Sequence, residues 1–85
     1  MKKANESQLV KIVNRLYTMR EDQSSDLQIR RFDLFGIESV KVTYNREHDL
    51  FTVENYQHNQ KFVFDNIELA SIEIYQALNE LKLTF

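Results

Sequence analysis

Residues 40–56 read VKVTYNREHDLFTVENY, and they carry the clearest structural pattern of the chain. Its apolar residues alternate with polar ones at Val40, Val42, Tyr44, Phe51 and Val53. A period of two is typical of a β-strand with one buried face, and β-branched and aromatic residues favour strands. The polar run at 45–49 between the two segments indicates a hairpin loop. The stretch therefore predicts two antiparallel strands joined by a hairpin.

Segments with the same period extend on both sides of this hairpin. Upstream lie Phe32 and Leu34, followed by Gly36, the only glycine, which marks a turn. Downstream, residues 57–60 are polar and lead to another short apolar-polar run. Short loops make an antiparallel meander the simplest topology. The residues expected on its buried face are Phe32, Leu34, Val40, Val42, Tyr44, Phe51, Val53, Phe62 and Phe64.

A helical pattern precedes the strands. The apolar residues at helical spacing are Leu9, Ile12, Val13, Leu16 and Met19. We expect this helix to begin near residue 6, with Asn5 or Ser7 as the N-cap. It should end where a polar run starts at Arg20, because that run cannot continue the buried stripe.

A second helical pattern follows the strands. Asp65 is expected to cap its first turn, with Glu68 reaching back, so that the helix runs from about Asn66. One apolar stripe comprises Ile67, Ala70, Ile74, Leu78 and Leu81. Leu69, Ile72 and Leu83 lie on nearly the opposite side. A helix resting on one sheet needs only one stripe, so the second stripe predicts burial against the first helix or a partner chain.

Together these patterns predict one α+β domain over residues 1–85. It is a two-layer α-β-β-β(-β)-α arrangement, in which an antiparallel meander sheet carries both helices on one face. Hydrophobic residues make up 42% and charged residues 28% of the chain, which is typical of a folded domain. Folding of so short a chain is marginal, and without cysteine no disulfide or thiolate zinc site can stabilise it. Association with another chain is therefore expected.

The charge distribution gives no general attraction for nucleic acid or anionic lipid. Eleven basic and 13 acidic residues leave a net charge of −2. The start of the chain has no apolar run after its lysines, so it is not expected to be a signal peptide, and no window is long and apolar enough to span a membrane. The expectation is a cytoplasmic protein that uses no cofactor.

The run Phe64-Asp65-Asn66-Ile67-Glu68, followed by Ser71-Ile72-Glu73-Ile74, resembles the C-terminal signature of the YkuJ-like family of short, uncharacterised Gram-positive bacterial proteins. Ser39-Val40-Lys41-Val42 and the helix of residues 9–16 fit the same pattern. The resemblance covers nearly the whole chain. It implies a two-layer α-β-β-β-α order and dimers formed by exchange of the C-terminal helices. It implies no activity and supplies no catalytic residues.

Candidate catalytic and metal-binding groups are few. His48 and His58 lie in loops at opposite ends of one predicted strand, too far apart to share an ion within a subunit. Glu47 and Asp49 beside His48 have no nucleophile or oxyanion donor next to them. With one glycine, no phosphate-binding loop can be written. The sequence therefore predicts no catalytic, cofactor-binding or metal residue.

The main alternative is weak RNA or regulatory-ligand binding on the open sheet face around Lys41. Helix, three strands and helix is also the element order of the double-stranded-RNA-binding domain, which holds phosphates at the start of its second helix. Here that start, Asp65 to Glu68, is acidic, so nucleic-acid binding is not favoured. Arg30 and Arg31 are neighbours in a strand and should point to opposite faces.

The prediction is a homodimeric protein-interaction module without catalytic activity. Its dimer contacts are expected at Leu69, Ile72, Tyr75 and Leu83, and its protein partner is unknown. Burial of apolar surface would drive the association.

Overall fold

The alternating segments form a four-stranded antiparallel sheet. The computed structural model describes residues 4–34 and 36–84, and the side chains of 8–33 and 36–80. In chain order the elements are α1 (Ala4–Glu21), β1 (Leu27–Leu34), β2 (Ile37–Asn45), β3 (Leu50–Asn55), β4 (Gln60–Phe64) and α2 (Ile67–Thr84). The strands lie in the order β1-β2-β3-β4, each antiparallel to the next. This confirms the α+β fold with a meander sheet.

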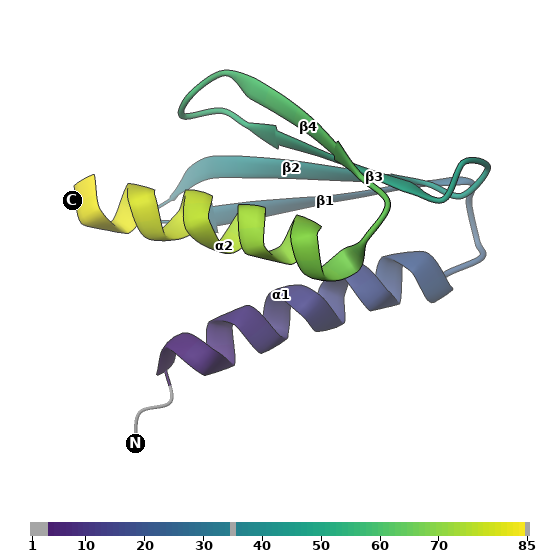
Figure 1. Cartoon of the computed structure of the whole chain (residues 1–85), viewed down its shortest axis with the longest axis horizontal. Coiled ribbons are helices and arrows are strands. Elements are labelled where there is room, and N and C mark those ends of the chain that lie inside the picture. Colours follow the sequence, from purple (N-terminus) through teal and green to yellow (C-terminus); the bar gives the residue numbers. More distant parts are fainter. Residues whose placement is uncertain (1–3, 35, 85) are drawn as a thin grey trace.

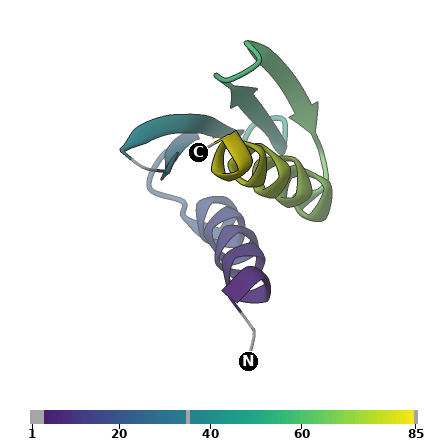
Figure 2. The same ribbon diagram turned by 90° about the vertical axis from the view of Figure 1, so that its left-hand side faces the viewer.

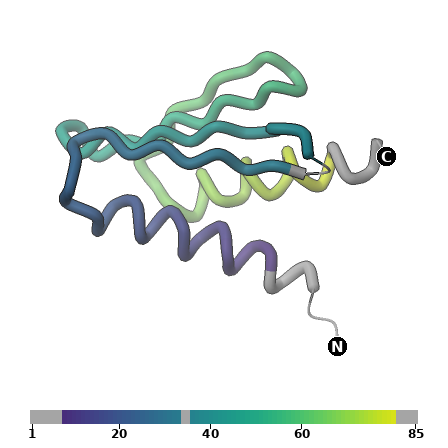
Figure 3. The backbone as a smooth tube through the Cα atoms, turned by 180° about the vertical axis from the view of Figure 1, so that it is seen from behind, coloured from purple at the N-terminus to yellow at the C-terminus, as the bar shows by residue number. Residues whose placement is uncertain are grey.

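Both helices lie on the same side of the sheet (Figures 1 and 2). α2 packs on all four strands, whereas α1 packs mainly on α2. The views from front and back both show β1 as the strand nearest to α1 (Figures 1 and 3). Within the described residues, the opposite face of the sheet carries no helix (Figure 2).

The core lies between the sheet and the helices. Its buried hydrophobic residues are Ile12, Leu16, Met19, Phe32, Val40, Val42, Tyr44, Phe51, Val53, Ile67, Ala70, Ile74, Ala77 and Leu78. The expected sheet face is confirmed from β1 to β3. On β4, Phe62 and Phe64 are only half-buried, because this strand is an edge of the sheet. The side chains of Leu34 and Leu81 lie outside the described residues.

The helix starts differ from the sequence prediction. α1 begins at Ala4, so Asn5 and Ser7 lie within the helix and are not its N-caps. At α2, the side-chain oxygen of Asn66 accepts a hydrogen bond from the Leu69 amide at 3.0 Å. The N-cap is therefore Asn66 and not Asp65. Aspartate and asparagine cap equally well, and here Asn66 is the residue that directly precedes the helix.

Arg46 ties the connection between α1 and β1 to the β2–β3 hairpin. Its amide donates to the Asp26 carbonyl at 2.9 Å, and its guanidinium donates to the Asp22 carbonyl. The same guanidinium lies 5.7 Å from the centre of the Tyr44 ring. The Tyr44 hydroxyl donates to Asp49 at 2.8 Å. This cluster fixes the end of α1 relative to the sheet.

Burial, and then the hydrogen bond to Asp49, raise the pKa of Tyr44 above its ordinary value of 10.0. The unfolded tyrosine loses its proton at a lower pH than the folded one. The stability that this difference contributes is fully present below pH 10 and is lost as the pH rises above it. We expect Tyr44→Phe to cost about 1 kcal/mol at neutral pH and to flatten the fall in unfolding free energy above about pH 10.

Urea denaturation of both proteins at a series of pH values measures this slope. Tyr56, whose pKa is raised by burial and by the charges of Glu38 and Glu54, is present in both proteins and cancels in the comparison. Equal slopes for the two proteins would contradict the assignment to Tyr44.

Ser71 is a buried polar residue in the contact surface of α2. Its side chain is 0% exposed, and its hydroxyl has no hydrogen-bond partner within the described part of the chain. An unsatisfied buried hydroxyl is destabilising, and alanine also favours helices more than serine does. We expect Ser71→Ala to raise the free energy of unfolding by about 1 kcal/mol, measured by urea denaturation.

Ser71→Val is the matched control, because it also removes the hydroxyl but adds volume to a fully packed site. We expect it to lower the free energy of unfolding by about 1–3 kcal/mol. A loss of stability in Ser71→Ala as well would show that the hydroxyl has a partner.

Candidate interaction surfaces

The outer face of α2 carries the first candidate surface, formed by Leu69 and Ile72. Leu69 is 54% exposed and Ile72 is 44% exposed, although Ile67 and Ile74 on the opposite side of the helix are buried. α1 therefore does not cover this face. Tyr75 is half-buried and packs against the core, so it borders the face. The side chain of Leu83 lies outside the described residues.

The open face of the sheet is the second candidate surface. One row of cross-strand neighbours joins Ile29, Thr43, Thr52 and Val63, and the next joins Arg31, Lys41, Glu54 and Lys61. Both ends of the first row are apolar and exposed. In the second row Glu54 separates Lys41 from Lys61, and Arg31 forms an ion pair with Glu38 at 3.1 Å. This face is therefore mixed in charge.

The third candidate surface is a groove between α1 and β1. One cavity of about 410 Å³ is lined by Gln8, Lys11, Ile12 and Arg15 of α1, by Arg31, Phe32 and Asp33 of β1, and by Leu78 of α2. A second cavity of about 470 Å³ is lined by Lys11, Asn14, Arg15, Thr18 and Arg30. Because Lys11 and Arg15 line both, the cavities form one groove, which we call the α1–β1 groove.

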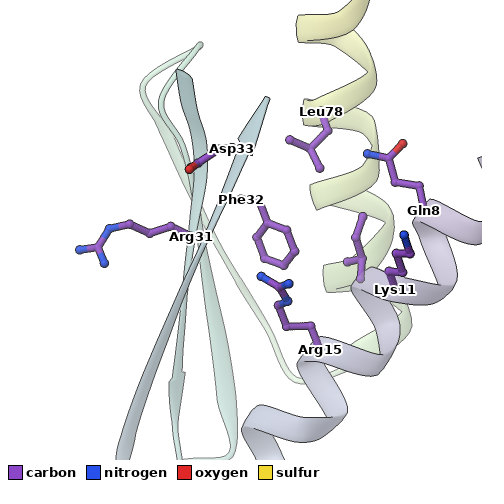
Figure 4. A pocket seen from close by; sticks show the side chains of 8 residues that line it. Gln8, Lys11, Arg15, Arg31, Phe32, Asp33 and Leu78 are labelled. Atoms are coloured by element: carbon purple, nitrogen blue, oxygen red, sulfur yellow. The ribbon is translucent and has the colours of Figure 1, made fainter. Parts of the chain in front are cut away.

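The side chain of Arg15 lines the α1–β1 groove and contacts Phe32. Its guanidinium lies 5.3 Å from the centre of the Phe32 ring, and the side chain reaches from α1 toward β1 (Figure 4). Arg31 and Asp33 point to the other side of β1 in the same view. Arg30 and Arg31 therefore have opposite orientations, as the strand period predicts: Arg30 faces the groove and Arg31 does not.

The two histidines occupy equivalent positions in the β2–β3 and β3–β4 hairpins. Asn45 accepts a hydrogen bond from the amide of His48 at 3.3 Å, and Asn55 accepts one from the amide of His58 at 3.3 Å. Each turn then ends in a left-handed residue, Asp49 with φ 55° and Asn59 with φ 54°. Asparagine and aspartate tolerate this conformation better than most residues. The repeated pattern Asn-x-x-His-Asp/Asn is a turn signal that the sequence interpretation missed.

His58 also reaches α2, where its Nε2 lies 2.8 Å from Glu80 Oε1. Both side chains are about half exposed. Among the described side chains, no group of three or more histidine, aspartate or glutamate residues could hold a metal ion. Within the same residues, no helix is long and apolar enough to cross a membrane.

Comparison with known proteins identifies relatives without an assigned role. The family model described as "Protein of unknown function (DUF1797)" matches residues 12–78. The uncharacterised protein YkuJ of Bacillus subtilis (strain 168) is 31% identical over 77 residues, which cover 85% of this chain and 98% of YkuJ. The X-ray structure of Bacillus subtilis YkuJ matches with a TM-score of 0.77 at 28% identity, over 85% of this chain and 98% of that one.

These matches confirm the YkuJ-like resemblance that was read from residues 64–74. The matches cover most of both chains, as the resemblance implied, and the similarity holds at the level of sequence and of fold. The protein therefore belongs to the DUF1797 family of proteins of unknown function and is a relative of YkuJ.

Proposed function

We propose that this protein is a homodimeric protein-interaction module that works by binding and not by bond chemistry. The observation that carries the proposal is the pair Leu69 and Ile72, exposed side by side on α2 and directed away from its own core. Residues three positions apart lie on one face of a helix, so the two side chains offer one apolar surface. The second copy of this chain is the occupant that we propose for it.

A symmetric dimer uses such a face twice. In an interface with two-fold symmetry the same patch serves both subunits, so one exposed leucine and one exposed isoleucine supply four buried side chains. Full burial of each such side chain contributes about 1.5–3 kcal/mol. A domain of this size gains stability from an added interface, because its own core is small.

Exchange of the C-terminal helices is a second route to the same dimer. α2 packs on the sheet of its own chain, and only Asp65 and Asn66 connect it to β4. An exchanged dimer would place the α2 of one subunit on the sheet of the other, with the same side chains in contact. In either arrangement the outer face of α2 remains available for the partner subunit.

We expect Ile72→Asp to weaken the dimer by about thirtyfold or more, because a carboxylate would be placed in an apolar contact. Sedimentation velocity or light scattering across a dilution series measures the change. Val10→Asp is the matched control, since Val10 is also exposed, at 55%, but lies on α1. The control should dimerise as the wild type does. Equal weakening by both variants, or by neither, would contradict the assignment to α2.

Weak RNA or regulatory-ligand binding on the open sheet face is the alternative. It would use Lys41 and the other cations of its row, but Glu54 interrupts that row and Glu38 already pairs with Arg31. We therefore favour the interaction module. Salt-sensitive retention of a double-stranded RNA that Lys41→Glu abolishes would support the alternative instead.

A further inference from the structure

We propose that the α1–β1 groove binds an extended acidic segment of a partner protein, which adds to β1 as a fifth strand. The inference rests on the proposed role as an interaction module and names a class of partner for it. It concerns a different surface from the outer face of α2, so the two proposals can fail separately.

The free edge of β1 provides the main-chain part of this site. β1 pairs only with β2, so within the described residues its other edge has no neighbouring strand. The Ser25 hydroxyl already bonds the amide and the carbonyl of Leu27, and Arg30 donates to the Ile29 carbonyl at 2.8 Å. The Ile29 amide and the residues that follow it therefore supply the main-chain groups for an added strand. Every second residue of an edge strand directs its N–H and C=O groups outward, where they can pair with an added strand. Arg31 and Asp33 line the cavity, although their side chains point away from it (Figure 4). It is therefore the main chain of β1 that borders the groove there.

The charges of the groove select for an acidic segment. Lys11, Arg15 and Arg30 line it, and none of them forms an ion pair with a described side chain. The only carboxylate among the lining residues is that of Asp33, which points to the opposite side of the strand. This concentration of positive charge contrasts with the net charge of −2 of the whole chain. Carboxylates bind such cations through charge-assisted hydrogen bonds.

The two faces of β1 predict an alternating pattern in the bound segment. Side chains of an added strand point alternately to the α1 side and to the open face of the sheet. On the α1 side they would meet Lys11 and Arg15. On the open face they would meet Leu27 and Ile29, which are 53% and 41% exposed. Neighbouring apolar side chains on one sheet face stabilise the pairing. The favoured segment therefore alternates acidic and β-branched apolar residues.

Fluorescence anisotropy with a labelled seven-residue peptide that alternates glutamate and valine tests the site. We expect binding that weakens with salt, and weakens about tenfold in Lys11→Glu and in Arg15→Gln. Lys61→Glu is the matched control, because it makes the same charge change as Lys11→Glu on the open face of β4, and it should bind as the wild type does. Circular dichroism checks that each variant is folded.

Two altered peptides separate strand addition from simple charge attraction. Replacement of every glutamate by lysine should abolish binding. N-methylation of the amides that would face β1 should abolish it as well, because it removes the main-chain donors. Amide resonances of residues 27–33 should shift when the unmodified peptide is added, and Ile72→Asp should leave this binding unchanged even if it dissociates the dimer.

Several results would overturn the proposal. These are absence of binding by the wild type, equal binding of the lysine or N-methylated peptide, and equal weakening by Lys61→Glu. Full displacement of the peptide by inorganic phosphate at constant ionic strength would assign the groove to small anions instead. Tighter binding of a double-stranded RNA, lost in Arg15→Gln, would assign it to nucleic acid.

Discussion

The packing of α2 on the sheet organises the whole domain. A meander sheet with one apolar face must cover that face, and one helix of 18 residues does so here by contacting all four strands. Because α2 occupies this position, α1 packs mainly on α2 and not on the strands. The outer face of α2, the open sheet face and the α1–β1 groove all result from this arrangement.

The α1–β1 groove exists because α1 is held at a distance from β1. The hydrogen bonds of Arg46 to the carbonyls of Asp22 and Asp26 anchor the connection between α1 and β1. The buried stripe of α1 is directed at α2. The next face of α1, which carries Lys11 and Arg15, is therefore left over the edge of β1. Polar side chains suit this position, because they remain hydrated while Arg15 also covers the Phe32 ring. The same hydration leaves their charges available to a partner.

The three surfaces differ in chemistry and so in the partner that each suits. The outer face of α2 exposes Leu69 and Ile72, an apolar pair that favours a second copy of the same helix. The groove combines a strand edge with three cations, Lys11, Arg15 and Arg30, that form no ion pair with a described side chain, and this favours an extended acidic chain. The open sheet face mixes cations with Glu38 and Glu54, so it provides no continuous field for a phosphate backbone. The family is one of unknown function, so these physical differences between the surfaces are what distinguish the candidate functions.

The hydrophobic periods of the sequence predicted the elements, the order of the strands and the buried faces, because the backbone repeat sets the direction of each side chain. The same period placed Leu69 and Ile72 opposite the buried stripe of α2, but it left open whether α1 or a partner chain covers them. Their exposure in this chain follows from the position of α1. The sequence also did not determine whether Asp65 or Asn66 caps α2, since both side chains are able to and only the backbone geometry selects one. The existence of the α1–β1 groove follows from the tertiary structure and could not be read from the sequence. Lys11 and Arg15, four positions apart, could be read as sharing a helix face, but their meeting with Arg30 depends on packing between segments that no local period encodes.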